Sequence, residues 1–166
     1  MNIHLAQPKD LTSLLKLFEE ARKTIATLGI DQWQDGYPSE TVIKEDIANH
    51  RCYVIERDGI LQGTFVLVEQ EPDYDKIYEG QWQTEAYIAI HRVAVSVAAR
   101  GTGITDGIIR YASDHAKNLG RTSLRIDTHR GNLPMRRMLE KHGFQHRGQI
   151  FLKDGAPRVA YEKSLW

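Results

Sequence analysis

The chain has 166 residues, the length of one domain over 1–166, and its 22 basic and 22 acidic side chains give a formal net charge of zero. That balance argues against nucleic acid as a partner, because affinity for a polyanion depends on an excess of clustered positive charge. Neither a run of about eighteen apolar residues nor a signal-peptide pattern occurs, so we expect a protein that does not enter a membrane and works in the cytoplasm.

The first part of the chain predicts a strand, two helices and a hairpin. Apolar residues recur every three or four positions between Leu11 and Leu28, as on one face of a helix. Two apolar runs flank Asp58-Gly59, a strong signal for a hairpin turn. Cys52, the only cysteine, falls in the first of these runs, which leaves no disulfide and no thiol cluster for zinc. The predicted elements are a strand at 3–5, helices at 11–28 and from 38, and strands at 52–56 and 60–68.

The rest of the chain predicts a long loop followed by alternating strands and helices. Residues 70–83 carry Pro72, Gly80 and four acids without periodicity, and loops of this length in compact domains are often functional. Strands are predicted at 86–95, 124–127, 144–152 and 159–165, with helices at 104–119 and 132–143. The pattern predicts an α+β fold, with a mixed, mostly antiparallel central sheet of about six or seven strands flanked by about four helices.

The segment from Val93 to Thr105 carries the strongest functional signal. An apolar strand ends in a turn at Gly101 and Gly103, and an amphipathic helix follows. Glycines allow successive N–H groups to converge on an anion, and the helix adds its positive dipole end, so the pattern predicts a phosphate site with Arg100 at its rim. An ordinary strand-to-helix turn is the alternative. A Rossmann site is disfavoured, because only about sixty residues follow the loop.

The charges are segregated along the chain. Residues 1–90 carry 8 Lys/Arg and 16 Asp/Glu, a balance of −8, whereas residues 91–166 carry 14 Lys/Arg and 6 Asp/Glu, a balance of +8. Such a split indicates either a polyanionic ligand bound beside a neutral or cationic one, or simply two solvated surfaces.

Two blocks of the sequence resemble the GNAT superfamily of acyl-CoA-dependent N-acyltransferases. The first is Val93–Val95 followed by Arg100-Gly101-Thr102-Gly103-Ile104, and the second runs from Asn132 and Met135 to Gly143-Phe144. The resemblance covers nearly the whole chain in element order. It implies a single GNAT domain in which a splayed strand pair forms a wedge for acetyl-CoA, the co-substrate, with no metal. It also implies transfer of the acetyl group to a primary amine of a small molecule or peptide, and it leaves a homodimer open.

The resemblance also implies a set of residues that bind acetyl-CoA. Backbone groups at the end of the strand would pair with the pantetheine arm, and N–H groups of the loop would meet the pyrophosphate. Asn132 would contact the pantetheine arm or would only cap its helix. Thr105 stands where the family usually has glycine or alanine. The implied set is Val93, Ala94, Val95, Arg100, Gly101, Thr102, Gly103, Ile104, Thr105 and Asn132.

Members of this family usually attack the thioester directly with the acceptor amine, which first has to lose a proton. Alternation along the strand predicts that His91, Tyr87 and Glu85 share one face with Val93 and Val95. An imidazole ionises near neutral pH, so His91 is the first candidate for the base. Glu85 is the alternative base, acting through water, and Tyr87 is a candidate acid. A strand histidine satisfied by a neighbour is the non-catalytic alternative.

The acceptor site and the general acid are less specified. Asp127 and Trp33, with the acids of residues 31–35 and 69–85, would attract and enclose a cationic amine. Leu139 fills the position at which many members carry a tyrosine that protonates the thiolate. That departure keeps open a non-catalytic acyl-CoA-binding or regulatory domain, and a nucleotide-binding module is a third reading.

Overall fold

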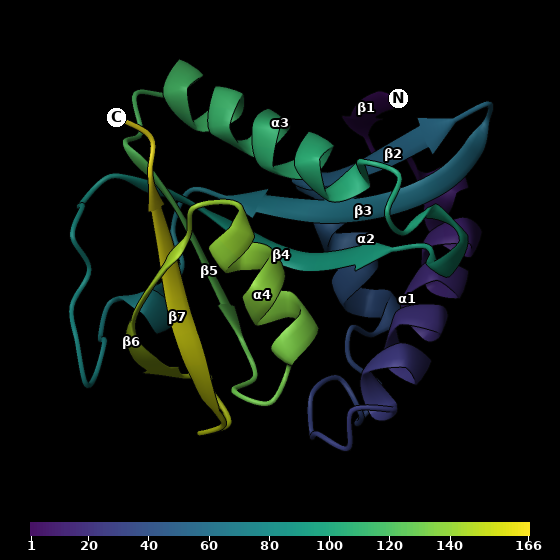
Figure 1. Cartoon of the computed structure of the whole chain (residues 1–166). Coiled ribbons are helices and arrows are strands. Elements are labelled where there is room, and N and C mark those ends of the chain that lie inside the picture. Colours follow the sequence, from purple (N-terminus) through teal and green to yellow (C-terminus); the bar gives the residue numbers. More distant parts are fainter. The chain divides into compact units, whose positions relative to one another are not determined.

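The computed structural model describes residues 1–166 (Figure 1). The strands are β1 (Asn2–Leu5), β2 (Cys52–Arg57), β3 (Ile60–Val68), β4 (Tyr87–Val95), β5 (Ser123–Thr128), β6 (Gln145–Phe151) and β7 (Pro157–Ser164). The helices are α1 (Leu11–Ala26), α2 (Glu40–Ala48), α3 (Ile104–Asn118) and α4 (Leu133–Lys141), with short 3₁₀ helices η1 (Pro8–Asp10), η2 (Pro72–Tyr74) and η3 (Val97–Ala99). The predicted number and order of strands and α-helices are confirmed.

The strands form one seven-stranded sheet in the order β1-β2-β3-β4-β5-β7-β6. By their contacts the residues divide into two compact units, the first comprising residues 1–67 and 92–108 and the second residues 68–91 and 109–166. None of the helices combines the length and the apolar character needed to span a membrane.

The first unit contains an antiparallel meander and a helix pair. β1 pairs with β2, and β2 with β3, through the predicted turn, where Asp58 and Gly59 both have positive φ, 52° and 75°. α1 packs against α2, which begins where the Ser39 hydroxyl accepts a hydrogen bond from the Val42 N–H at 3.2 Å. Cys52 is buried in β2, and burial raises the pKa of its thiol to about 11, as for an unreactive strand residue.

The second unit is built on the C-terminal hairpin of β6 and β7, yellow in Figure 1. β7 pairs antiparallel with β5, and β5 pairs parallel with β4. The predicted long loop is packed into this unit: the Tyr74 side chain is only 1% exposed, and it forms a cluster with Ala89, Ile150 and Ala160. The loop residue Tyr78 pairs with Gln149 of β6. Tyr74 anchors the loop in the core, whereas most of the other loop residues are exposed or half-buried.

The predicted divergence of two strands lies between β4 and β5. Their parallel pairing covers only Tyr87–Ala89 and Ser123–Arg125. Ile90 and His91 do not continue it, although β4 runs on to Val95. Within the second unit, the pairing of β4 with β5 thus ends before Ile90, as the family resemblance implies for a splayed strand pair.

Candidate functional site

The glycine loop, residues 100–103, joins η3 to α3 in the first unit. Gly101 and Gly103 have φ angles of 74° and 90°, which glycine adopts without steric cost. α3 starts directly after them at Ile104, so its first N–H groups have no carbonyl of a preceding turn. The N–H groups of Gly101, Gly103, Ile104 and Thr105 donate no hydrogen bond within the chain. The loop therefore presents unused donors and a helix N-terminus to an anion.

Two arginines border the glycine loop. Arg100 is exposed, as expected for a residue at the rim. Arg57, at the end of β2, donates from Nη2 to the Thr102 carbonyl at 2.5 Å. No local signal in the sequence marks Arg57, because only the β2–β3 hairpin brings it to the loop. The Thr102 N–H and hydroxyl both bond the Ala99 carbonyl, so this residue uses its polar groups to shape the loop.

The end of β4 departs from regular strand geometry at Arg92, whose φ is 48°. A left-handed residue interrupts the alternation of a strand. The prediction that His91 shares one face with Val93 and Val95 depends on regular alternation. That alternation is interrupted at Arg92. His91 and the two valines are half-buried, and Ala94 is buried.

An ion-pair network holds Arg92 in this conformation. Its Nε and Nη2 contact the Asp46 carboxylate at 2.6 and 2.8 Å, and its Nη1 donates to the Tyr37 hydroxyl at 2.7 Å. Arg51 binds the same buried carboxylate at 2.7 Å. Burial alone would lower the pKa of Arg92, but Asp46 and Tyr37 raise it above its ordinary value. Asp46 thus links α2 to the end of β4.

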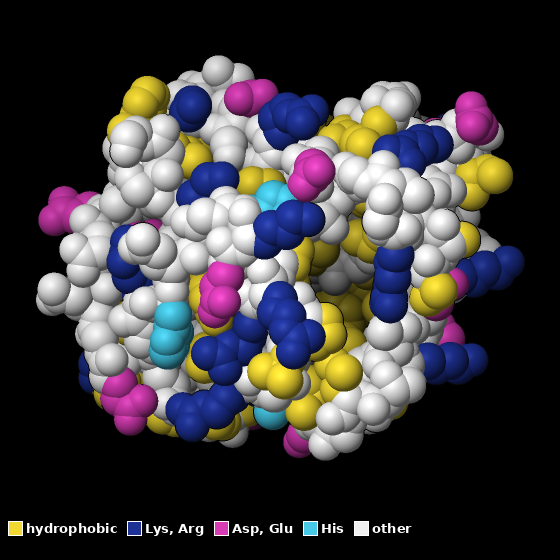
Figure 2. Space-filling model, in the orientation of Figure 1, with side chains coloured by type: hydrophobic (Ala, Val, Ile, Leu, Met, Phe, Trp, Pro, Cys, Tyr) yellow, Lys and Arg dark blue, Asp and Glu magenta, His cyan; other side chains and the backbone are white.

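α4 of the second unit presents basic side chains on its surface, where Figure 2 shows Lys and Arg gathered. Arg136 is engaged, since its Nε donates to the Tyr161 hydroxyl at 2.9 Å, whereas Arg137 is exposed. Leu139, at the position of the family's tyrosine, is fully buried. Asn132 caps α4 by accepting from the Met135 N–H at 3.3 Å, which is the capping role considered above. Its contact with pantetheine stays a prediction.

The His91 cluster, defined as Glu71, Tyr74, His91 and Asp127, lies in the second unit. Nε2 of His91 is 2.9 Å from Oε1 of Glu71, although the two groups are not aligned as a hydrogen bond. The rings of Tyr74 and His91 are 5.8 Å apart, and the Tyr74 hydroxyl donates to Asp127 Oδ2 at 2.6 Å. Burial raises the pKa of Tyr74 well above its ordinary value, and Asp127 reinforces the shift, so this phenol remains a donor.

Several carboxylates surround the cluster. Burial raises the pKa of neighbouring Asp73, and the Glu71 and Asp127 carboxylates raise it further, because like charges disfavour ionisation. Despite these acids, nowhere in the chain do three or more His, Cys, Asp or Glu side chains gather as a metal site requires. The arrangement is suited to a cation or to a proton transfer.

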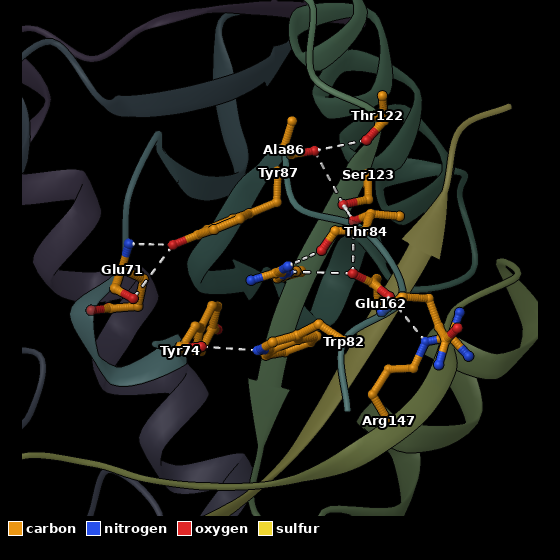
Figure 3. Close-up of polar contacts among 12 residues, drawn as sticks. Glu71, Tyr74, Trp82, Thr84, Ala86, Tyr87, Thr122, Ser123, Arg147 and Glu162 are labelled. Atoms are coloured by element: carbon orange, nitrogen blue, oxygen red, sulfur yellow. Dashed lines mark hydrogen bonds and ion pairs between the residues drawn. The ribbon is translucent and has the colours of Figure 1, made fainter. Parts of the chain in front are cut away.

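Figure 3 shows how Tyr87 connects this cluster to the sheet. The Tyr87 hydroxyl accepts the Glu71 N–H at 2.8 Å. The Arg125 guanidinium lies over the rings of Tyr87 and Trp82, at 4.1 and 4.2 Å from their centroids. The buried Glu162 binds Arg125 at 3.3 Å. Tyr87, a candidate acid in the sequence, is thus hydrogen-bonded to the backbone of the loop.

The remaining predicted site residues are Glu85 and Trp33. The prediction that Glu85 lies on the strand face with His91 is wrong. Glu85 is exposed in the bend before β4, which begins only after Ala86, whose carbonyl accepts a hydrogen bond from the Thr122 N–H at 2.9 Å. Glu71 is the acid beside His91, and the sequence marked it only as one of several acids in a loop. Trp33 belongs to the first unit, where its ring contacts Phe18.

Comparisons with known proteins confirm the resemblance over nearly the whole chain. A model of the acetyltransferase (GNAT) family matches residues 12–144. A GNAT-family acetyltransferase structure from Streptococcus agalactiae is 37% identical, with 98% of this chain and 94% of that chain covered and a TM-score of 0.89. None of the curated proteins matches the chain.

Two more distant structures share the fold alone. A GNAT-family acetyltransferase from Listeria monocytogenes is 23% identical, with 98% of this chain and 94% of that chain covered and a TM-score of 0.73. A ribosomal-protein-alanine N-acetyltransferase from Brucella melitensis is 19% identical, with 99% of each chain covered and a TM-score of 0.71.

Proposed function

Because the chain belongs to the GNAT acetyltransferase family, we propose that it transfers the acetyl group of acetyl-CoA to a primary amine of a small molecule or peptide. The observation that carries the proposal is the glycine loop, where four N–H groups, those of Gly101, Gly103, Ile104 and Thr105, have no partner in the chain. Such donors at a helix N-terminus favour a pyrophosphate. Exposed Arg100 and nearby Arg57 add positive charge at the same place.

The end of β4 would hold the rest of the co-substrate. Val93 to Val95 would pair with the pantetheine arm through their backbone groups, as an added strand does. The Val95 N–H would donate to the oxyanion that forms when the amine attacks the thioester carbonyl.

The acceptor is proposed to be a cationic amine without acidic substituents. His91 would take the proton of its ammonium group, and the carboxylates of Glu71, Asp73 and Asp127 would attract its positive charge. The raised pKa of Asp73, caused by burial and by its two acidic neighbours, supports an excess of negative charge here. No tyrosine stands at Leu139, so the departing thiolate would take its proton from water.

Calorimetric titration with acetyl-CoA tests the proposal, with a matched pair of glycine variants. Gly103 and Gly155 have φ angles of 90° and 86°, and neither would place a Cβ against backbone. Alanine therefore strains both positions alike. We expect Gly103→Ala to weaken acetyl-CoA binding about tenfold, and Gly155→Ala, in the β6–β7 turn, to bind as the unaltered protein does.

Turnover is measured next, with a panel of amines and detection of free thiol. Faster release of CoA with cationic than with acidic amines would support the proposal. Tight binding without turnover of any amine would indicate a non-catalytic acyl-CoA-binding domain, and binding of NAD or ATP in place of acetyl-CoA would refute the proposal altogether.

A further inference from the structure

We infer that Glu71 is a positioning residue for His91: its carboxylate holds the hydrogen of the neutral imidazole on Nε2 and leaves Nδ1 to accept a proton from the acceptor amine. The inference rests on the proposed function, in which His91 is the base. Glu71 lies in the loop before β4 and His91 in β4 itself, so only the packed structure brings them together.

The contact between the two side chains has the atoms and the distance that this role requires. Nε2 of His91 is 2.9 Å from Oε1 of Glu71, and the side chains are only 14% and 21% exposed. Nε2 nevertheless has no aligned hydrogen bond. We give the distance more weight than the missing alignment, because catalytic contacts are often poorly aligned without substrate and tighten when it binds. A carboxylate only accepts hydrogen bonds, so it favours the hydrogen on the facing nitrogen.

Glu71 is itself held in place on both sides. Its N–H donates to the Tyr87 hydroxyl at 2.8 Å, and its Oε2 accepts the Asp73 N–H at 3.3 Å, at the start of η2. The Arg125 guanidinium lies 4.1 Å from the centroid of the Tyr87 ring, and the buried Glu162 binds it. Oε1 is left to face His91. A group that orients another has to be fixed by its own surroundings, and Glu71 meets that condition.

Of the polar side chains around His91, Glu71 is the one in contact with Nε2. The Tyr74 hydroxyl is directed to Asp127 on β5, at 2.6 Å. Lys153 adds a positive charge near Asp73, and the other charged groups of the surroundings are the carboxylates of Asp73 and Asp127. Both would stabilise a positive charge on the imidazole without being in contact with its Nε2.

The step assigned to the pair is one proton transfer. An N–H bond of the acceptor ammonium breaks, its electron pair stays on the amine nitrogen, and the proton goes to Nδ1 of His91. The resulting imidazolium carries hydrogen on both nitrogens and faces the Glu71 carboxylate, which stabilises it. The proton then passes to water, which restores the neutral ring.

Steady-state kinetics of Glu71→Gln test the inference, because glutamine keeps the size of the side chain and removes its charge. We expect kcat to fall about 10- to 100-fold, while KM for acetyl-CoA stays within about twofold. The matched control is Glu56→Gln, which alters a second Glu–His pair, with His4 at 3.5 Å, outside the cluster. This control should retain the kcat of the unaltered protein.

The double variant separates positioning from a general structural role. If Glu71 acts through His91, then Glu71→Gln combined with His91→Gln is no slower than His91→Gln alone. Losses that multiply, or a Glu71→Gln protein with unaltered kcat, would overturn the inference.

A spectroscopic measurement keeps the inference testable even without turnover. In protein labelled with ¹⁵N-histidine, the His91 signals are identified by their loss in His91→Gln. The neutral ring should carry its hydrogen on Nε2 almost exclusively, and because free histidine already favours this tautomer, the test is a rise of the Nδ1–H form in Glu71→Ala. A ring with its hydrogen on Nδ1 in the unaltered protein would overturn the inference. An Nε2–H ring in a protein that acetylates no amine would instead refute the proposed function and leave the pairing intact.

Discussion

Glu162 is the side chain on which the polar interior of the second unit depends. It is 0% exposed, and it accepts hydrogen bonds from the Thr84 hydroxyl at 2.8 Å and from Arg147 at 3.0 Å, besides its contact with Arg125. Burial alone would raise the pKa of Glu162, but these donors and the Gln83 N–H lower it below its ordinary value. The carboxylate therefore stays ionised in the folded protein.

We expect Glu162→Gln to lower the free energy of unfolding by about 3 kcal/mol, because it leaves two arginines without their buried partner. The pKa of Glu162 is lower in the folded than in the unfolded chain, so its contribution is complete above the ordinary value of 4.5 and is lost as the pH falls through the lowered value. The two proteins should therefore converge in acid. Urea unfolding between about pH 7 and pH 3 measures the difference.

Asp154→Asn is the control for this experiment, since Asp154 is exposed and only accepts the Ala156 N–H in a turn. A difference between the proteins that stays constant down to the lowest pH would contradict the assigned role of Glu162.

Among the elements, β4 carries several candidate site residues and departs from regular strand geometry. The left-handed conformation of Arg92 breaks its alternation between His91 and Val93. The conformation costs energy for a residue with a side chain, and the Asp46 carboxylate of α2 offsets this cost through two contacts with the guanidinium. The strand end thus depends on a helix from a distant part of the sequence.

We expect Asp46→Asn to destabilise the protein by about 3 kcal/mol, because Arg51 and Arg92 both lose their buried counter-charge. Chemical unfolding measures this loss. Glu45→Gln, the exposed neighbour on the same helix, should stay within about 0.5 kcal/mol of the unaltered protein. Equal effects of the two substitutions would show that α2 merely tolerates changes of charge poorly, and would contradict the anchoring role of Asp46.

At the scale of the whole molecule, the proposed co-substrate should stabilise the fold, because a ligand that binds only the folded chain raises its free energy of unfolding. At about 100 times Kd the gain is about 2.7 kcal/mol, which corresponds to a rise in Tm of about 5 to 10 °C for a chain of this size. Thermal unfolding with and without acetyl-CoA measures the rise.

NAD at the same concentration serves as the control, since it also carries a pyrophosphate but lacks a pantetheine arm. An equal rise in Tm with NAD would mean that the glycine loop binds pyrophosphate without discriminating acetyl-CoA, which would contradict the proposed selectivity.

The parts of the molecule that follow from local rules could be predicted from the sequence alone. The Asp58-Gly59 hairpin and the start of α3 after Gly103 occur where turn chemistry and periodicity place them, because both depend on neighbouring residues. The loop with unused N–H donors could be predicted for the same reason. The family resemblance added the pairing of that loop with acetyl-CoA, which the residues by themselves left open.

The tertiary structure alone decided which distant side chains meet. It placed Glu71, and not Glu85, beside His91, and it brought Arg57 to the Thr102 carbonyl. The conformation of Arg92 likewise reflects Asp46, a residue of another element. Such contacts arise from packing between segments far apart in the chain, and no local pattern encodes them. The sequence determined the elements and the glycine loop, whereas packing determined the partners of the candidate base, because partner choice is a property of the assembled core.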